Sequence, residues 1–315
     1  MKAETDLDTA EGRLASNTDD LGLNSVRAKP RIGLLAGWGR FPIVVAETLR
    51  RQGCDIFCLG IKGHADPALR DLVDDFTWLG VAKLGRAIRY FRRHRVREAT
   101  MAGKIHKTLI YQPWSWIKHF PDWEFVKTFY PHFVQAKFDK KDDTLLGTIV
   151  AAFERNGIRF APATDYAPEL LVKPGQLSGR PLSNSQMRDI EFGWHLAKEM
   201  GRLDIGQSVC VKEQAVLAIE AIEGTDECVR RAGALCPSGG FTVVKVAKPR
   251  QDMRFDVPTI GVGTLETMAA AGAKVLAVEA ARTILLDESE FLRLASRLKI
   301  AVAALDESGR LKMAA

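Results

Sequence analysis

Residues 31–61 read RIGLLAGWGRFPIVVAETLRRQGCDIFCLGI, and this stretch decides the expected fold. Residues 32–36 form an apolar run typical of a buried strand, and a glycine-rich turn follows it. Pro42 suits the first turn of a helix, which we expect to continue to about residue 51 and to end before Gly53. A second apolar run at residues 55–61 completes a strand–helix–strand unit.

The same alternation continues along the chain. Residues 76–81 and 99–102 are expected strands with an amphipathic helix at 84–94 between them, and a second series of strands and helices follows residue 160. This order predicts an α/β protein of two α/β domains, the N-terminal one a Rossmann-like, mostly parallel sheet. The expected divisions are a disordered leader at 1–28, an N-terminal α/β domain at 29–138, a connecting helix and linker at 139–160, and a C-terminal α/β domain at 161–315.

Composition and charge exclude several classes of protein. The chain has 315 residues, 46% of them hydrophobic, and a mean hydropathy of −0.08, as in water-soluble globular proteins. No apolar run approaches the roughly 18 residues of a membrane span, and residues 1–28 lack the apolar segment of a signal peptide. Five cysteines without a CxxC pair indicate a reduced, cytoplasmic chain. The net charge of +6 favours an anionic partner, but it is spread over many helices, so we expect no nucleic acid.

The first candidate site follows strands of the N-terminal domain. The turn at residues 37–42 reads GWGRFP and opens a helix, whose free backbone amides can bind an anion. Gly37 and Gly39 would admit a phosphate or a sugar, with Arg40 beside them. Proline at position 42 breaks the dinucleotide fingerprint, so a nicotinamide cofactor is disfavoured. Gly103 and Lys104 follow another strand and are further candidates for binding phosphate, although Lys104 could equally be a surface lysine.

The second candidate site lies at residues 216–227, VLAIEAIEGTDE. Glu220 falls on the strand face where an apolar side chain would be buried, and a buried carboxylate needs a cation or a metal. Glu223, Thr225 and Asp226 follow in the turn. Thr225 or Asp226 could simply cap the next helix, whereas four oxygen-bearing side chains together suit Mg²⁺ or Mn²⁺.

The third candidate site is the segment AKPRQDMRFDVPTIG at residues 247–261, which joins two apolar strands. A plain turn does not need five charges of alternating sign within nine residues. A lattice of structural salt bridges is one interpretation. Phosphoryl chemistry is the other, because cations neutralise phosphate oxygens while a carboxylate binds a metal or orients water. The five charged residues are Lys248, Arg250, Asp252, Arg254 and Asp256.

Several stretches resemble the LpxI family of UDP-2,3-diacylglucosamine pyrophosphatases, in order from about residue 31 to residue 306. They read IGLLAGWGRFP, AGKIHK, DDTLL, GRLDIGQSVCVKEQAVLAIEAIEGTDE, KVAKPRQDMRFDVPTIG and GAKVLAVEAARTILLD. The resemblance implies hydrolysis of UDP-2,3-diacylglucosamine to UMP and 2,3-diacylglucosamine 1-phosphate (lipid X), in lipid A biosynthesis. It also implies Mg²⁺, with Mn²⁺ as an alternative, a ligand held between two α/β domains, a homodimer, and a catalytic aspartate at Asp256.

The residues can be given roles consistent with that resemblance. Lys248, Arg250 and Arg254 would neutralise the pyrophosphate, and the glycine turns would face the sugar phosphate. The acids divide between holding a metal and orienting water, with Asp256 and Asp226 as catalytic candidates and metal ligands drawn from Asp256, Asp226, Glu223 and Glu220.

Two expectations concern function and location. The alternative function is a nucleotide-sugar or dinucleotide-binding protein without hydrolysis, which the acid cluster disfavours because carboxylates repel a polyanion unless a metal is present. Since an acylated UDP-sugar is a lipid, we expect a cytoplasmic enzyme that makes transient contact with the surface of the inner membrane. The basic run at residues 92–97 could provide that contact, or could be a solvated helix end.

Overall fold

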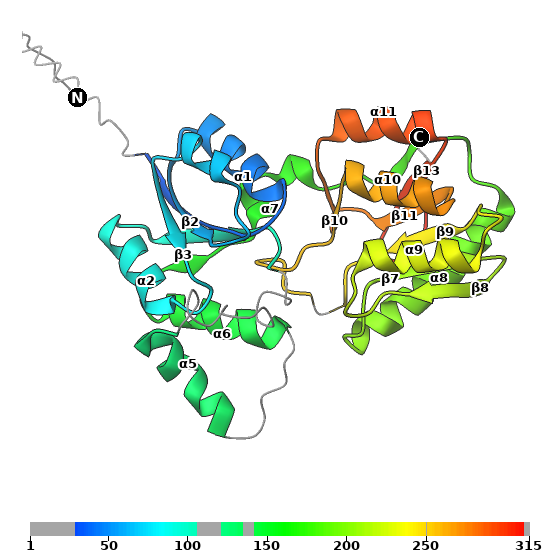
Figure 1. The fold of residues 1–315 in the computed structure, drawn as a ribbon. Coiled ribbons are helices and arrows are strands. Elements are labelled where there is room, and N and C mark those ends of the chain that lie inside the picture. The colour runs from blue at the N-terminus through cyan, green and yellow to red at the C-terminus, as the bar shows by residue number, and fades with distance from the viewer. Residues whose placement is uncertain (1–28, 106–120, 135–141, 250, 312–315) are drawn as a thin grey trace, which may run out of the picture.

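The chain is described by a computed structural model over residues 29–105, 121–134, 142–249 and 251–311. Two sheets stand side by side, each covered by helices (Figure 1). We call the part that carries the first sheet the N-terminal half and the part that carries the second sheet the C-terminal half. Across the described stretches, no helix is both long enough and apolar enough to cross a bilayer.

The N-terminal half is an α/β unit with five parallel strands in the order β3-β2-β1-β4-β5. One face packs against α1 and the short helix α7, and the other against α2 and α6, so buried side chains lie on both faces. This confirms the Rossmann-like, mostly parallel sheet. The strands are β1 (Arg31–Ala36), β2 (Asp55–Ile61), β3 (Asp75–Leu79), β4 (Glu98–Ala102) and β5 (Arg159–Phe160), and the helices are α1 (Phe41–Arg51), η1 (Pro67–Asp71), α2 (Leu84–Arg93), α5 (Trp123–Val134), α6 (Asp142–Glu154) and α7 (Ala163–Tyr166).

The segment expected to connect the domains, residues 139–160, contributes to the first sheet where it is described. Strand β5 pairs with β4, with Ala99 opposite Phe160. Phe153 of α6 and Ile158 are buried in the same core cluster as Phe160. These apolar side chains can leave water only by packing on the sheet, which draws the segment into the N-terminal half.

The C-terminal half is built on a mixed sheet of six strands in the order β6-β13-β11-β9-β7-β8. Strands β13, β11 and β9 are parallel, while β6 and β7 run antiparallel to their neighbours. The strands are β6 (Gly175–Ser178), β7 (Ser208–Lys212), β8 (Ala215–Ile219), β9 (Thr242–Lys245), β11 (Val275–Glu279) and β13 (Ala301–Leu305).

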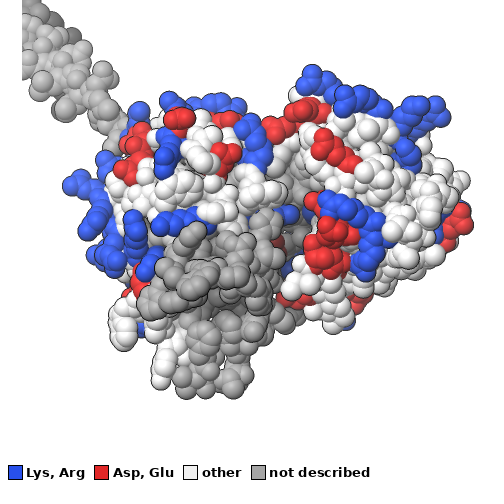
Figure 2. All heavy atoms as spheres, in the orientation of Figure 1, with Lys and Arg blue, Asp and Glu red and all other residues white. Residues whose placement is uncertain are grey.

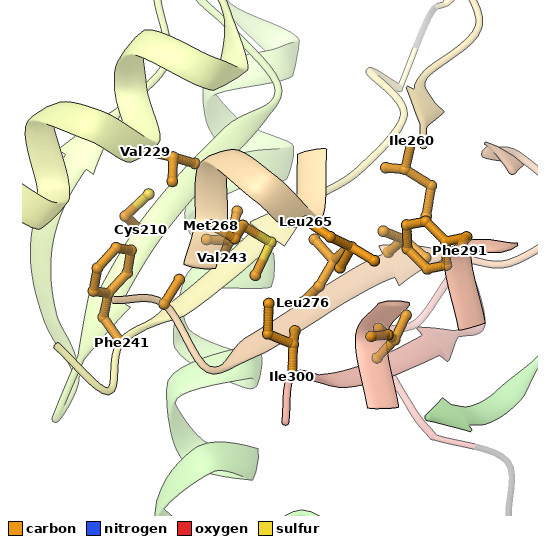
Figure 3. Packing of buried hydrophobic residues seen from close by; sticks show 14 of the residues in the cluster. Cys210, Val229, Phe241, Val243, Ile260, Leu265, Met268, Leu276, Phe291 and Ile300 are labelled. Carbon is orange, nitrogen blue, oxygen red and sulfur yellow. The ribbon is translucent and has the colours of Figure 1, made fainter. Parts of the chain in front are cut away.

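Helices cover both faces of this second sheet. Helix α8 packs on one face, and α9, α10 and α11 pack on the other, where Figure 3 shows Val243 of β9 beside Met268 and Leu265 of α10. Buried apolar area on both faces is the main stabilising contribution to such a layered core. The helices are α8 (Asn184–Arg202), α9 (Thr225–Leu235), α10 (Val262–Ala271) and α11 (Glu288–Leu298).

The charged segment between β9 and β10 joins the two halves. In Figure 1 the chain leaves the second sheet here and passes toward the first. Phe255 packs against the core cluster of the N-terminal half, and Val257 packs against a small cluster that includes Val44 of α1 and Leu286. The short elements around this small cluster are η2 (Pro168–Leu170) and the paired strands β10 (Thr259–Ile260) and β12 (Ile284–Leu285).

Glu98 of β4 joins this strand to β5 and to α7 through side-chain hydrogen bonds. Its carboxylate accepts a hydrogen bond from Arg159 Nη2 at 2.7 Å and another from the hydroxyl of Tyr166. These two bonds lower the pKa of Glu98 below its ordinary value of 4.5, against the opposing effect of burial. The ionised form therefore stabilises the fold.

We expect Glu98→Gln to lower the melting temperature at neutral pH, and the difference from the wild type to vanish in acid. Because the pKa is depressed in the folded state, the stabilisation is present above the unfolded pKa and is lost as pH falls through the folded pKa. Thermal unfolding of both proteins between about pH 3 and pH 7 tests this. Glu47→Gln is the control, since its exposed pair with Arg40 is 3.5 Å long and should contribute little. A difference between wild type and Glu98→Gln that persists unchanged below pH 4.5 would contradict the argument.

Candidate active site between the two sheets

Two glycine turns follow β1 and β4 and cross each other closely. Trp38 and Lys104 form an antiparallel bridge, with Trp38 N donating to Lys104 O at 2.7 Å and Lys104 N donating to Trp38 O at 3.0 Å. A Cβ on Gly37 would lie 2.7 Å from Lys104 O. Gly103 has φ +90° and a Cβ there would lie 2.8 Å from both Pro42 Cγ and Trp38 O. The contacts of Gly37 and Gly103 are thus between the loops, whereas Gly39, at φ +105°, borders open space.

Gly103→Ala should therefore destabilise the protein by about 1–3 kcal/mol, through the strained φ and the overpacked crossing. Gly147→Ala is the matched control. It lies inside α6 with nothing within 4 Å of a new Cβ, so alanine there should stabilise by about 0.5–1 kcal/mol. Denaturant unfolding of the three proteins measures both effects. If Gly103→Ala were as stable as the wild type, the close crossing would not require glycine.

Glu220 is buried, as its position on the strand face predicted, and it belongs to a hydrogen-bonded network. It follows β8 and is 7% exposed. Thr225 donates its hydroxyl proton to Glu220 Oε1 at 3.1 Å, and Ser208 Oγ lies 3.3 Å from the same hydroxyl. Lys245 Nζ donates to Thr225 Oγ1 at 3.2 Å and to the backbone carbonyl of Thr259 at 3.0 Å. The network joins the ends of β8 and β9 to the start of α9.

Lys245 is the residue that the sequence analysis missed. It is 4% exposed, at the carboxyl end of β9, within a run that otherwise reads as an apolar strand. The available signal was one lysine among valines, on the face that carries Val243. Burial lowers the pKa of Lys245, and the charge of Lys104 lowers it further, while the carboxylates of Glu220, Asp226 and Asp256 act in the opposite direction. Since Lys104 belongs to the N-terminal half, both halves contribute charges here.

Lys248 and Asp256 lie together in the charged segment. Lys248 Nζ is 2.6 Å from Asp204 Oδ1 and 3.7 Å from Asp256 Oδ2. The backbone of Asp256 is held by a hydrogen bond from its N–H to the carbonyl of Asp252 at 3.0 Å. The lysine and the aspartate are both partly buried, so their charges are screened less than those of a surface pair.

Arg254 lies in a lattice of salt bridges, the other interpretation of the charged segment. Its guanidinium donates to both carboxylate oxygens of Asp252 and reaches Glu154 of α6 at 3.1 Å. Burial of Asp252 would raise its pKa, but the hydrogen bonds and charge of Arg254 outweigh that effect and lower it. Arg254 therefore bridges the two halves in this structure, so the segment combines structural ion pairs with the Lys248–Asp256 pair. The predicted residue Arg250 lies outside the described residues.

Other predicted site residues are engaged elsewhere. Arg40 lies 3.5 Å from Glu47 and 3.5 Å from Asp287 of the C-terminal half. Glu223 pairs with Arg231 at 2.5 Å. Thr225 is the first residue of α9 rather than its cap, because Gly224 holds the cap position with φ 85° and no side-chain cap bond. Asp226 is exposed in the first turn of that helix.

The acidic residues that could hold a divalent cation are Asp226 and Asp256. Among residues 29–105, 121–134, 142–249 and 251–311, no group of three or more His, Cys, Asp and Glu side chains is arranged to hold a metal ion. Mg²⁺ commonly binds through one or two carboxylates together with substrate phosphates and water. Glu223 accepts from Arg231, and Glu220 is buried and accepts from Thr225 through Oε1, while its Oε2 has no hydrogen-bond partner among the described residues. The donor set thus fits a cation shared with a phosphate, not one enclosed by protein ligands alone.

Comparison with known proteins covers both halves of the chain. Residues 31–170 match the model of the LpxI N-terminal domain, and residues 173–303 match that of the LpxI C-terminal domain. The UDP-2,3-diacylglucosamine pyrophosphatase LpxI of Caulobacter vibrioides is 29% identical over 289 residues, which cover 89% of this chain and 99% of that protein. The similarity thus includes both sheets and the segment that joins them.

Proposed function

The chain belongs to the LpxI family, and we propose that it hydrolyses the pyrophosphate of UDP-2,3-diacylglucosamine in lipid A biosynthesis. The products would be UMP and 2,3-diacylglucosamine 1-phosphate, formed as water adds to one phosphorus and the bridging oxygen leaves with the other. The Caulobacter relative carries this substrate in its name. The structural observation that supports the proposal most directly is the Lys248–Asp256 pair, 3.7 Å apart, in a segment that packs on the N-terminal half through Phe255. The charges of Lys104, Asp226 and Asp256 also act on the buried Lys245, so both halves contribute.

In this proposal the lysines hold the substrate and Asp256 acts on water. The ammonium groups of Lys104 and Lys248 would offset the negative charge of the pyrophosphate, which is the main requirement of phosphoryl transfer. Asp256 would orient the attacking water and accept its proton. Phe255 and Val257 flank Asp256 in the sequence, and each packs against an apolar cluster. Their packing fixes the backbone that carries the Asp256 carboxylate. Gly39 and Arg40 remain candidates for contact with the sugar phosphate.

We also propose that Mg²⁺, or Mn²⁺ in its place, binds through Asp226 and Asp256. A bound cation would supply further neutralisation of the pyrophosphate charge. Removal of divalent ions with a chelator should then reduce hydrolysis, and Mg²⁺ should restore it. A homodimer on the cytoplasmic side of the inner membrane completes the proposal, and light scattering would measure that oligomeric state.

The variant Asp256→Asn should lower the rate of UDP-2,3-diacylglucosamine hydrolysis by about 10²–10⁴-fold, the usual contribution of a general base. It should fold normally, because the substitution keeps the size of a partly exposed side chain. Melting temperature and UMP release are measured on the same preparation, with saturating Mg²⁺.

Asp252→Asn is the matched control for Asp256→Asn. It removes a carboxylate from the same segment, but one that pairs with Arg254 rather than with Lys248. We expect this variant to lose melting temperature and to keep most of the turnover. A well-folded Asp256→Asn protein with more than about a tenth of the wild-type rate would exclude the general-base role and make Asp226 the candidate base.

The basic surface of α2 is the proposed contact with the membrane. Figure 2 shows Lys and Arg along the margin of the N-terminal half where Figure 1 draws α2. Anionic headgroups attract basic residues by about 1 kcal/mol for each residue near the surface, and salt screens the attraction. The exposed arginines of this helix and the turn after it are Arg86, Arg89, Arg92, Arg93, Arg95 and Arg97.

Flotation with vesicles that contain an anionic phospholipid should therefore recover the protein at low salt and release it at high salt. The double variant Arg92→Glu and Arg93→Glu should bind the vesicles several-fold less, since each reversal replaces attraction by repulsion. Arg188→Glu, an exposed change on α8, serves as the control and should bind nearly as well as the wild type. Retention that resists salt and needs detergent would contradict a surface contact.

A further inference from the structure

Lys245 carries a buried charge whose described partners are all neutral. Its side chain donates to the hydroxyl of Thr225 and to the carbonyl of Thr259. Within the described residues, no carboxylate oxygen lies within 4.0 Å of its Nζ. A buried ammonium without a counter-charge is costly to the fold. An ammonium also has three N–H donors, so two bonds leave one of them for a further acceptor.

The network around Thr225 fixes the direction of that ammonium. A hydroxyl has a single proton, and Thr225 gives it to Glu220 Oε1. The oxygen of Thr225 is then left only to accept, and it accepts from Lys245. Glu220 thus acts on Lys245 through Thr225, without forming a direct ion pair with it. This arrangement orients the charge and leaves it without a direct ion pair among the described residues.

The amino end of α9 lies at the same place and independently favours an anion. Thr225, which contacts Lys245, is the first residue of this 11-residue helix. The cap residue Gly224 makes no side-chain bond to the first turn, so backbone N–H groups there remain available to a ligand. Asp226 and Lys104 are exposed, and their charges act on the pKa of Lys245 after the larger effect of burial. Because Thr225 contacts Lys245 and directly precedes the exposed Asp226, the ammonium lies close to a residue that solvent and ligands can reach.

We propose that Lys245 is a direct ligand of the substrate, with its third N–H donated to an oxygen of the pyrophosphate. Thr225 and Glu220 are positioning residues that hold this ammonium toward the amino end of α9. The inference rests on the proposed function for the identity of the substrate, but the anion site itself does not depend on hydrolysis. A purely structural lysine, tying β9 to β10 through Thr259, is the alternative, and it predicts different results.

The test compares Lys245→Met with Lys212→Met by calorimetry, using inorganic pyrophosphate and UMP as probes in the presence of Mg²⁺. Lys212 is the matched control, because it is a partly buried lysine of the same sheet. It lies at the other end of the strand pair β7–β9, where it donates to Ser238 and to the Gly239 carbonyl. Loss of a charged hydrogen bond should raise the Kd of pyrophosphate for Lys245→Met by about ten- to a hundredfold. Lys212→Met should bind as the wild type does.

Melting temperature and kinetics separate binding from a structural role. If Lys245 is a substrate ligand, Lys245→Met should melt at or above the wild-type temperature, because it removes a buried charge that has no direct ion pair. KM for the acylated UDP-sugar should then rise. A lower melting temperature with unchanged pyrophosphate affinity would overturn the proposal, and so would a wild-type protein that binds neither pyrophosphate nor UMP.

Two substitutions of Thr225 keep the proposal testable if Lys245→Met fails to fold. Thr225→Val removes the acceptor that orients Lys245, whereas Thr225→Ser keeps a hydroxyl, so Thr225→Ser should bind pyrophosphate more tightly than Thr225→Val. Equal affinity of the two would count against the positioning role and the proposal. If the wild type binds pyrophosphate through Lys245 but releases no UMP from the acylated UDP-sugar, the proposed function fails and the anion site stands.

Discussion

The placement of Asp256 depends on apolar packing by its two neighbours in the sequence. Phe255 packs on the core cluster of the N-terminal half, and Val257 packs on the small cluster shared by α1 and the chain near β12. A carboxylate cannot anchor itself in an apolar interface, but these two side chains lose water when the halves meet and so hold the residue between them. The ion pairs of Arg254 with Asp252 and Glu154 further fix the orientation of this segment against α6 of the N-terminal half.

The mixture of charges at the candidate site fits what the proposed pyrophosphate substrate would require. Lysines alone would bind a polyanion but could not activate water, and carboxylates alone would repel it. Two lysines of the C-terminal half, Lys248 and Lys245, differ in the charge of the groups that they contact. Lys248 has carboxylate neighbours in Asp204 and Asp256, whereas the described contacts of Lys245 are a hydroxyl and a carbonyl. The more buried of the two lysines is thus the one without a direct ion pair among the described residues, which is the basis for proposing it as an anion ligand.

The glycines of the N-terminal half show how backbone geometry can resemble a ligand site. A glycine turn after a strand and before a helix is typical of phosphate binding, and the turn at residues 37–39 has that order. In the structure the tight space beside Gly37 is filled by the backbone of Lys104, and that beside Gly103 by Pro42 and Trp38. The crossing fixes the backbone of Lys104, whose charge acts on Lys245 of the C-terminal half, so the tight packing of these glycines positions a lysine rather than opening a phosphate pocket.

The sequence by itself determined the two α/β units, the parallel first sheet and the burial of Glu220, because periodicity and turn residues act over short distances. It also identified the segment around Asp256 by its unusual charges. Only the tertiary structure separated Arg254, tied to Glu154, from Lys248 beside Asp256, and only it showed that Lys245 is buried at the meeting point of the halves. The reason is that the residue type alone gives the charge of a side chain, whereas its hydrogen-bond partners and its burial depend on segments far away in the sequence.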